Sequence, residues 1–179
     1  MFALSYIQQI LGLENKSFHE QELLDIATDS RAILEGKRTL FVAIKASHRN
    51  GHDFIKAAYE KGVRCFLVSD AIATESFPNA NFLQVNDTIL ALQSIAAAIR
   101  ARQQCTIVGI TGSNGKTIVK EWLAYLLEDK CNVYKSPLSY NSQIGVPLAV
   151  WKMPQKIDLG IFEAGISKKN EMHLSLIHI

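Results

Sequence analysis

The chain has 179 residues, of which 48% are hydrophobic and 20% are charged, with 4 prolines and 10 glycines. This composition excludes a disordered, collagen-like or low-complexity chain and leaves enough apolar side chains for one large or two small folded domains. The 19 basic and 17 acidic residues give a formal net charge of +2. A dedicated nucleic-acid-binding protein usually has a basic excess or a basic stripe, so we expect no nucleic-acid partner.

The cysteines and the N-terminal segment bear on the cellular compartment. Cys65, Cys105 and Cys131 are far apart and form no C-x-x-C pair, which is typical of a reduced compartment. The N-terminal segment lacks the basic region and long apolar run of a signal peptide. No stretch reaches the roughly 20 apolar residues needed to cross a bilayer. We therefore predict a cytoplasmic protein with no membrane partner.

Hydrophobic periodicity predicts a small α/β domain over residues 1–102. Helices are expected where apolar residues recur every three or four positions, and strands where short apolar runs lie between turn residues. Asn86 and Asp87 are expected to cap a long helix that ends near Arg102. The other predicted helices cover residues 5–11 and 52–61, and the predicted strands cover 39–44, 63–68 and 82–85, after a short apolar run at 23–27.

A second domain is predicted from residue 103 to residue 179. Strands at 106–111, 132–134 and 157–162 alternate with helices at 117–127 and 144–150. This alternation predicts a parallel sheet with right-handed crossovers. Because it stops after the third strand, we expect only the truncated start of such a domain. Residues 174–179 have no cap, turn or charge and are expected not to be native, so His173 and His178 are set aside.

The strongest chemical signal is the segment G-I-T-G-S-N-G-K-T at 109–117. It follows an apolar strand and opens a helix, which is where a phosphate-binding loop is found. Glycines allow a tight turn that points backbone N–H groups inward, and the helix adds its positive N-terminal end. The pattern departs from G-x-x-x-x-G-K-[ST], since Ile110 occupies the first glycine position. The predicted nucleotide-binding residues are Thr111, Gly112, Ser113, Asn114, Gly115, Lys116 and Thr117.

A carboxylate is expected to complete this site with Mg²⁺. Glu163 lies at the carboxyl end of the predicted strand, directly after residues 157–162. The carboxyl ends of parallel strands face the ligand crevice. We predict that Thr117 and Glu163 hold the metal ion and that Lys116, Thr117 and Glu163 form the catalytic set. A surface glutamate at a strand end is the alternative. Between the two motifs, the segment 139–147 reads by itself as an ordinary turn and helix cap.

Together these motifs resemble the Mur ligases, ATP-dependent amide-forming enzymes of peptidoglycan synthesis. The loop G-I-T-G-S-N-G-K-T and the strand end E-A-G are similar to the family's phosphate loop and magnesium site. The T-D-S-R at 28–31, the L-F-V-A-I-K at 40–45 and the N-G-H-D-F at 50–54 resemble the family's blocks for UDP-N-acetylmuramoyl peptides. The N-S-Q-I-G-V-P-L at 141–148 resembles the block of members that add D-alanyl-D-alanine. Ala46, Asn50 and Ser142 depart from the family pattern.

The resemblance implies a substrate set and a reaction. ATP would phosphorylate the carboxylate of UDP-N-acetylmuramoyl-tripeptide, and the amine of D-alanyl-D-alanine would attack the acyl phosphate. We expect the full-length protein to be a monomer and the present chain to be an inactive fragment of it. Asn141 would contact phosphate or substrate near the loop. His52 and Asp53 would line the sugar pocket or simply cap their helix. The residues implied to bind the UDP-sugar are Ser30, Arg31, Lys45, His52 and Asp53.

Several alternatives stay open at this point. The Mur ligase that adds the third stem amino acid shares the phosphate loop and the S-R motif, although the I-G-V-P-L block argues against it. Folylpolyglutamate synthetase shares the loop but lacks the UDP-binding domain. A binding module without turnover is also compatible with the motifs. A GTPase would need an N/T-K-x-D motif, which Asn170-Glu171 does not supply.

Overall fold

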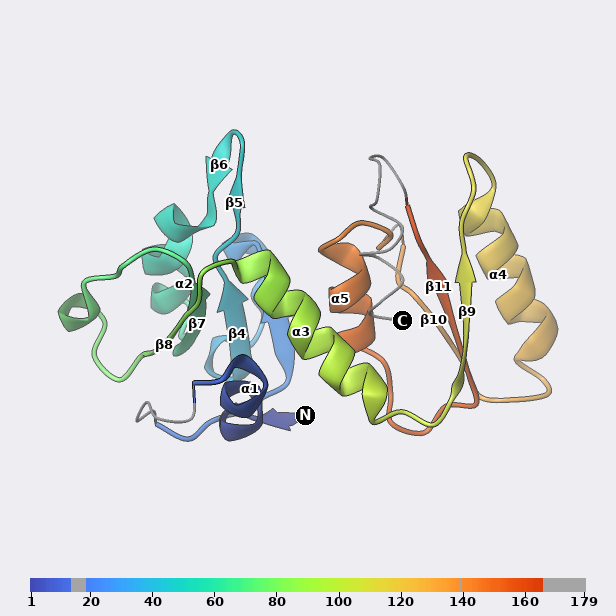
Figure 1. Cartoon of the computed structure of the whole chain (residues 1–179), viewed down its shortest axis with the longest axis horizontal. Coiled ribbons are helices and arrows are strands. Elements are labelled where there is room, and N and C mark those ends of the chain that lie inside the picture. The colour runs from blue at the N-terminus through green and yellow to red at the C-terminus, as the bar shows by residue number, and fades with distance from the viewer. Residues whose placement is uncertain (14–18, 139, 166–179) are drawn as a thin grey trace. The chain divides into compact units, whose positions relative to one another are not determined.

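The computed structural model describes residues 1–13, 19–138 and 140–165 (Figure 1). The chain divides into two compact units, Met1–Leu92 and Gln93–Ile179. The division falls within the long helix α3 (Thr88–Ala101), so a boundary at residues 102 and 103 stays a prediction. The expectation for residues 174–179 lies outside the described residues.

A four-stranded parallel sheet with the order β3-β4-β7-β8 forms the centre of the first unit. Its two inner strands, T-L-F-V and C-F-L-V, are buried along their whole length, as is typical of a parallel sheet that is covered on both faces. The α/β class predicted for this part of the chain is thus confirmed, and the parallel pairing of its strands is an additional finding. The strands are β3 (Asp25–Ala27), β4 (Thr39–Val42), β7 (Cys65–Val68) and β8 (Asn81–Gln84).

Aromatic rings dominate the core on one face of this sheet. The Phe66 ring stacks on Phe82 with centroids 5.1 Å apart and meets Phe41 edge-on at 6.2 Å. Ile55 and Ala58 of helix α2 (Ile55–Glu60) belong to the same buried cluster. Alternate residues of a strand point to opposite faces, which brings these rings from neighbouring strands together.

The remaining elements of the first unit are short. Helix α1 (Leu4–Leu11) ends at Gly12, whose φ of 66° is the left-handed conformation common after a helix. Two small antiparallel pairs, β1–β2 and β5–β6, were not predicted. Their bounds, with those of the 3₁₀ helices, are β1 (Phe2–Ala3), β2 (Glu22–Leu23), β5 (Lys45–Ala46), β6 (Arg49–Asn50), η1 (Ser30–Ala32), η2 (Gly36–Arg38), η3 (Gly51–Phe54) and η4 (Thr74–Ser76).

Side-chain caps begin helix α3 and the 3₁₀ helices η1 and η3. Asp87 accepts hydrogen bonds from the N–H groups of Ile89 and Leu90 at 2.7 and 3.0 Å, so the predicted cap of α3 is confirmed. The start of the predicted helix 52–61 is different, because η3 precedes α2 and the side chain of Asn50 accepts the His52 N–H at 3.1 Å. Asn50, rather than His52 or Asp53, is therefore the N-cap.

The second unit contains a three-stranded parallel sheet with the order β10-β11-β9. Figure 1 shows α4 and α5 on opposite sides of it. Because β11 pairs with both other strands, its carboxyl end lies beside the end of β9, where the glycine loop begins. The elements are β9 (Thr106–Ile110), α4 (Lys116–Leu127), β10 (Val133–Lys135), α5 (Gly145–Trp151) and β11 (Leu159–Glu163).

Helix α4 has an unusual distribution of side chains. Its buried residues are Lys120 and Ala124, whereas Trp122, Tyr125 and other large apolar side chains of the helix are exposed. A surface helix normally buries its apolar stripe. The burial of a lysine in its place indicates a specific polar contact.

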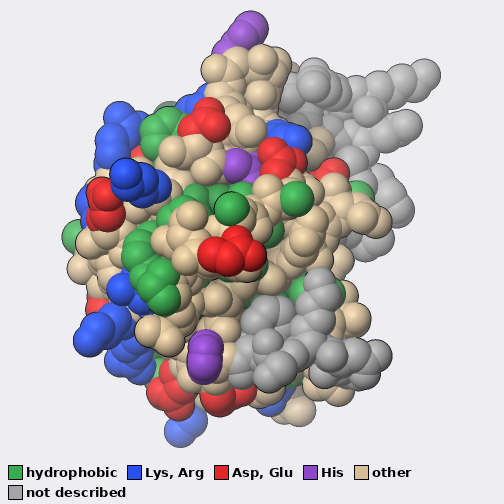
Figure 2. Space-filling model, turned by 90° about the vertical axis from the view of Figure 1, so that its left-hand side faces the viewer, with side chains coloured by type: hydrophobic (Ala, Val, Ile, Leu, Met, Phe, Trp, Pro, Cys, Tyr) green, Lys and Arg blue, Asp and Glu red, His purple; other side chains and the backbone are tan. Residues whose placement is uncertain are grey.

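Figure 2 views the side of the first unit that carries α2, where apolar side chains lie near the centre and most Lys and Arg side chains lie along one edge. Among the described residues, no helix is both long and apolar enough to span a membrane.

Candidate functional site

The glycine loop between β9 and α4 has the backbone that a phosphate-binding loop requires. Gly112 has φ 144° and Gly115 has φ 77°, conformations that a side chain would disfavour. Residues 111–115 are exposed, and α4 begins at Lys116, so its free N–H groups and positive end face the loop. Lys116 Nζ donates to the Gly112 carbonyl at 2.7 Å and thereby lies over the loop.

Thr117 and Glu163 meet at the base of this loop, as the sequence predicts. The Thr117 hydroxyl donates to Glu163 Oε2 at 3.2 Å, and the Glu163 side chain is fully buried at the end of β11. The hydroxyl and the carboxylate are hard oxygen donors. Mg²⁺ binds such donors together with the phosphates of a nucleotide. No group of three acidic, histidine or cysteine side chains that could hold a metal alone occurs among the described residues.

Glu163 has a second partner that the sequence analysis missed. Lys120 Nζ lies 2.8 Å from Glu163 Oε1, and both side chains are 0% exposed. Oε1 accepts no well-oriented hydrogen bond from the described residues. The charge of Lys120 therefore offsets the cost of burying this oxygen. The donor set therefore fits a magnesium ion on the Oε2 side, next to Thr117, since Oε1 already faces a cation.

Asn141 is brought to the same end of the sheet. Its carbonyl accepts a hydrogen bond from Gly165 N–H at 2.7 Å, just beyond the end of β11. A Cβ at Gly165 would come within 2.9 Å of that carbonyl, so glycine is required for this close approach. Ser142, one of the departures from the family pattern, accepts the Gly145 N–H at 3.0 Å through its hydroxyl and stabilises the start of α5.

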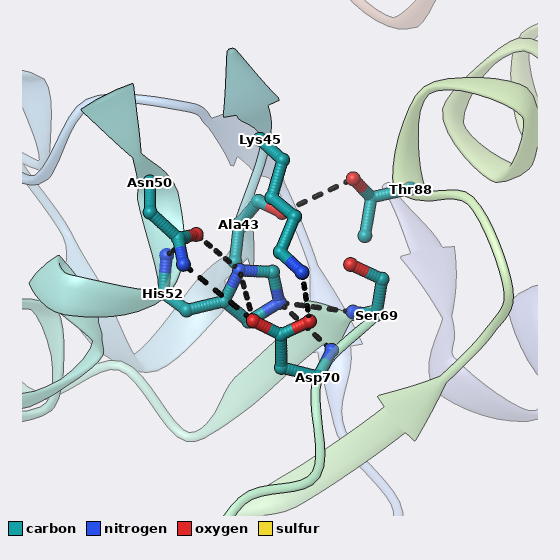
Figure 3. Close-up of polar contacts among 7 residues, drawn as sticks. All are labelled: Ala43, Lys45, Asn50, His52, Ser69, Asp70 and Thr88. Carbon is teal, nitrogen blue, oxygen red and sulfur yellow. Dashed lines mark hydrogen bonds and ion pairs between the residues drawn. The ribbon is translucent and has the colours of Figure 1, made fainter. Parts of the chain in front are cut away.

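In the first unit, Lys45 and His52 belong to a polar cluster built around Asp70 (Figure 3). Lys45 forms an ion pair with Asp70 at 2.5 Å, which holds the pKa of that carboxyl below its usual range. Lys45 and Ser69 also line a cavity of about 130 Å³ with residues 86–89, next to the start of α3. The sequence analysis missed Asp70, because nothing nearby in the sequence indicates its partner.

His52 is a buried element of this cluster rather than an exposed pocket residue. Its Nε2 accepts the N–H groups of Ser69 and Asp70 at 2.9 and 3.2 Å, and its Nδ1 lies 2.7 Å from Asn50 Oδ1. These partners assign the neutral tautomer with the proton on Nδ1. Burial lowers the pKa of His52 and the Lys45 charge adds to this, while the Asp70 and Asp53 charges oppose it. Asp53 itself is exposed on η3.

The segment T-D-S-R forms a third group. Asp29 caps η1 through the Arg31 N–H at 2.9 Å and binds the Arg31 guanidinium, with Nη2 at 2.6 Å. Arg49 from the β5–β6 hairpin lies 3.9 Å from the same carboxylate. The Arg31 hydrogen bonds hold the pKa of Asp29 well below its usual range. Arg31 is 79% exposed, so its outer N–H groups are open to an anion, whereas Ser30 is buried.

Two family models match consecutive parts of the chain. The model described as "Mur ligase family, catalytic domain" matches residues 25–113, and the "Mur ligase middle domain" matches residues 110–178. The first match includes the T-D-S-R segment and the β5–β6 region. The second includes the phosphate loop and β11.

Curated proteins and solved structures agree with these models. UDP-N-acetylmuramoyl-tripeptide–D-alanyl-D-alanine ligase of Bacillus subtilis is 33% identical over 90% of this chain and 35% of its own length. The Synechocystis protein of the same name is 35% identical over 92% of this chain and 36% of its own length. The chain thus spans about a third of these relatives.

The structural neighbours carry related names. One is a UDP-N-acetylmuramoylalanyl-D-glutamyl-2,6-diaminopimelate–D-alanyl-D-alanyl ligase from Acinetobacter baumannii, with a TM-score of 0.81 at 25% identity over 94% of this chain and 37% of that chain. Another is the MurF ligase of Thermotoga maritima in complex with ADP, with a TM-score of 0.73 at 28% identity over 86% of this chain and 35% of that chain. With both family models, these likenesses extend over most of the sequence, and the chain belongs to the Mur ligase family.

Proposed function

We propose that the chain is part of an ATP-dependent ligase that adds D-alanyl-D-alanine to UDP-N-acetylmuramoyl-tripeptide. The observation that carries the proposal is the pairing of Thr117 with Glu163 at 3.2 Å directly beneath an exposed phosphate-binding loop. The names of the relatives supply the substrates, and the ADP complex of the Thermotoga neighbour supports a nucleotide at the loop. We also propose a cytoplasmic, monomeric full-length protein.

The second unit would bind and orient the nucleotide. The N–H groups of residues 111–117 and the α4 terminus would hold the phosphates, and Lys116 would leave the Gly112 carbonyl to reach the transferring phosphoryl group. Thr117 and Glu163 would hold Mg²⁺, which supplies charge neutralisation at the phosphates. Asn141, at the same sheet end, would contact phosphate or substrate.

The chemistry assigned to the whole protein is a carboxylate activation. A carboxylate oxygen of the tripeptide would form a bond to the γ-phosphorus of ATP as the bond to ADP breaks. The amine of D-alanyl-D-alanine would then attack the acyl carbon, phosphate would leave, and the amine would lose a proton. Positioning and electrostatic stabilisation are the main contributions a protein makes to such a phosphoryl transfer.

The first unit would bind the UDP-sugar. Arg31 and Lys45 are basic groups with exposed side chains, suited to a diphosphate or carboxylate. Ser30, buried beside Arg31, would shape the segment. We propose that His52 fixes the turn at Ser69 and Asp70 rather than touching the ligand, because both ring nitrogens already have partners. The role of Asp53 stays a prediction.

Phosphate release by the full-length protein tests this proposal. ATP, UDP-N-acetylmuramoyl-tripeptide and D-alanyl-D-alanine are supplied together and then omitted one at a time. Release that requires all three is expected, and the K116A variant should abolish it while UDP-sugar binding persists. K130A, which removes an exposed lysine beyond α4, is the matched control.

Other results would redirect the assignment. Release with the dipeptide precursor and a free amino acid would favour the ligase that adds the third residue. No release with either set would favour a binding module. Normal turnover in K116A would contradict the role of the phosphate loop.

A further inference from the structure

Lys120 is a buried cation that the proposed reaction does not use directly. Its side chain is 0% exposed, although lysine is almost never fully buried without a partner. Its Nζ donates to the carbonyls of Ser136 and Leu138 at 2.9 and 2.8 Å and lies 2.8 Å from Glu163 Oε1. Two of the three ammonium protons are thus donated to carbonyls, and the contact with Glu163 Oε1 is an ion pair.

The position of Lys120 on α4 explains how it reaches Glu163. Residues three apart on a helix lie on the same face, so Thr117 and Lys120 approach β11 together. Thr117 contacts Oε2 and Lys120 contacts Oε1 of the same carboxylate. The two residues hold the carboxylate from both sides and thereby fix which oxygen is turned toward the phosphate loop.

The same lysine ties the loop after β10 to this carboxylate. Ser136 receives a hydrogen bond from Lys120 through its carbonyl, and its N–H donates to Ile161 of β11 at 2.8 Å. The Glu163 N–H donates to Ser136 Oγ at 3.4 Å. The backbone N–H of Glu163 therefore contacts Ser136, and its side chain contacts Lys120, which itself binds the Ser136 carbonyl.

We propose that Lys120 is a positioning residue that reserves Glu163 Oε2 for the metal ion of the bound nucleotide. This inference rests on the proposed function, because it assumes a metal–nucleotide complex at Thr117 and Glu163. With Oε1 held by an ammonium, Glu163 offers one oxygen, so a divalent cation requires nucleotide phosphates to complete its ligands. Lys120 acts through Glu163 and touches neither nucleotide nor metal.

A purely structural role for Lys120 makes a different prediction. Loss of a structural contact would lower thermal stability and weaken nucleotide binding equally with and without metal. Loss of a positioning contact would reduce mainly the extra affinity that the metal provides. The ratio of the nucleotide dissociation constants without and with Mn²⁺ separates the two roles.

The experiment measures ADP binding to the full-length protein by calorimetry, with and without Mn²⁺. In K120M, the ratio should fall by about 10- to 100-fold, the usual effect of removing a group that orients a metal ligand, while binding without metal stays near the wild-type value. The control K130M, at an exposed lysine, should keep the ratio. An unchanged ratio in K120M would overturn the inference and leave the proposed function standing. No metal effect in the wild type would overturn both.

A measurement on the wild type covers the case in which K120M does not fold. A crystal structure with ADP and Mn²⁺ locates the metal by its anomalous signal. The inference requires Mn²⁺ on the Oε2 side of Glu163, directly or through one water, with Lys120 still on Oε1. Coordination through Oε1, with Lys120 displaced, would overturn it.

Discussion

Replacing His52 with leucine is expected to destabilise the first unit at neutral pH and to remove an acid-sensitive component of its stability. The imidazole is 5% exposed and accepts the N–H groups of Ser69 and Asp70 (Figure 3). Leucine has a similar size but no acceptor. The two N–H groups would depend on water in a half-buried turn.

The expected loss at pH 7.5 is about 1 to 3 kcal/mol. One unsatisfied buried donor costs about 1 to 3 kcal/mol, and two are affected, but Ser69 and Asp70 are only partly buried, so water restores part of the loss. The loss should be visible in urea unfolding, because small domains are stable by only about 5 to 15 kcal/mol.

The pH dependence follows from the lowered pKa of His52 in the folded chain. Below the ordinary histidine pKa of 6.5, His52 is protonated in the unfolded chain but still neutral in the folded chain. The free energy of unfolding therefore falls as the pH falls. The slope reaches at most about 1.4 kcal/mol per pH unit and ends at the folded pKa, below which both states are protonated. Asp70 and Asp29 have lowered pKa values, so their ionised carboxylates stabilise the folded chain, and this stabilisation is lost only at more acidic pH.

Urea unfolding between pH 5 and 8, followed by far-ultraviolet circular dichroism, measures this slope. Both tryptophans, Trp122 and Trp151, lie in the second unit, so their fluorescence would not report on the first. The slope between pH 6.5 and 5 should be smaller in H52L than in the wild type. H48L, which changes an exposed histidine, is the control. Equal slopes in H52L and the wild type, or a His52 NMR titration above pH 6.5, would refute the reasoning.

Three further predictions test other parts of the chain. F66A should destabilise the first unit by about 3 to 5 kcal/mol, as large-to-small core substitutions do, because Phe66 is fully buried against Phe41 and Phe82; a smaller loss in urea unfolding would contradict this packing. In G115A the new Cβ has free space, but alanine at a φ of 77° strains the backbone by about 1 to 2 kcal/mol. Calorimetry should therefore show weaker nucleotide binding, and an unchanged affinity would exclude a role for this loop shape. R31A should weaken UDP-sugar binding without changing ADP binding, and a parallel loss of both would indicate misfolding instead.

The sequence by itself determined those features that depend on neighbouring residues. The alternation of strands and helices predicted the parallel sheet of the second unit, and the glycines before Lys116 predicted the phosphate loop, because backbone conformation and helix polarity are local properties. Glu163 was predicted as a site residue because the carboxyl end of a parallel strand has a known place in such folds. The Asp87 cap is local in the same sense.

Only the tertiary structure decided the partners of Lys120, Lys45 and His52. Lys120 in sequence looks like a solvated charge beside Glu121 on an amphipathic helix, and nothing local indicates that it is buried. It becomes a partner of Glu163 because β11 lies between β9 and β10, which places the end of β11 against α4. Asp70 meets Lys45, and His52 meets the turn after β7, for a similar reason. Such long-range pairs depend on strand order and close packing, which no short segment of the sequence encodes.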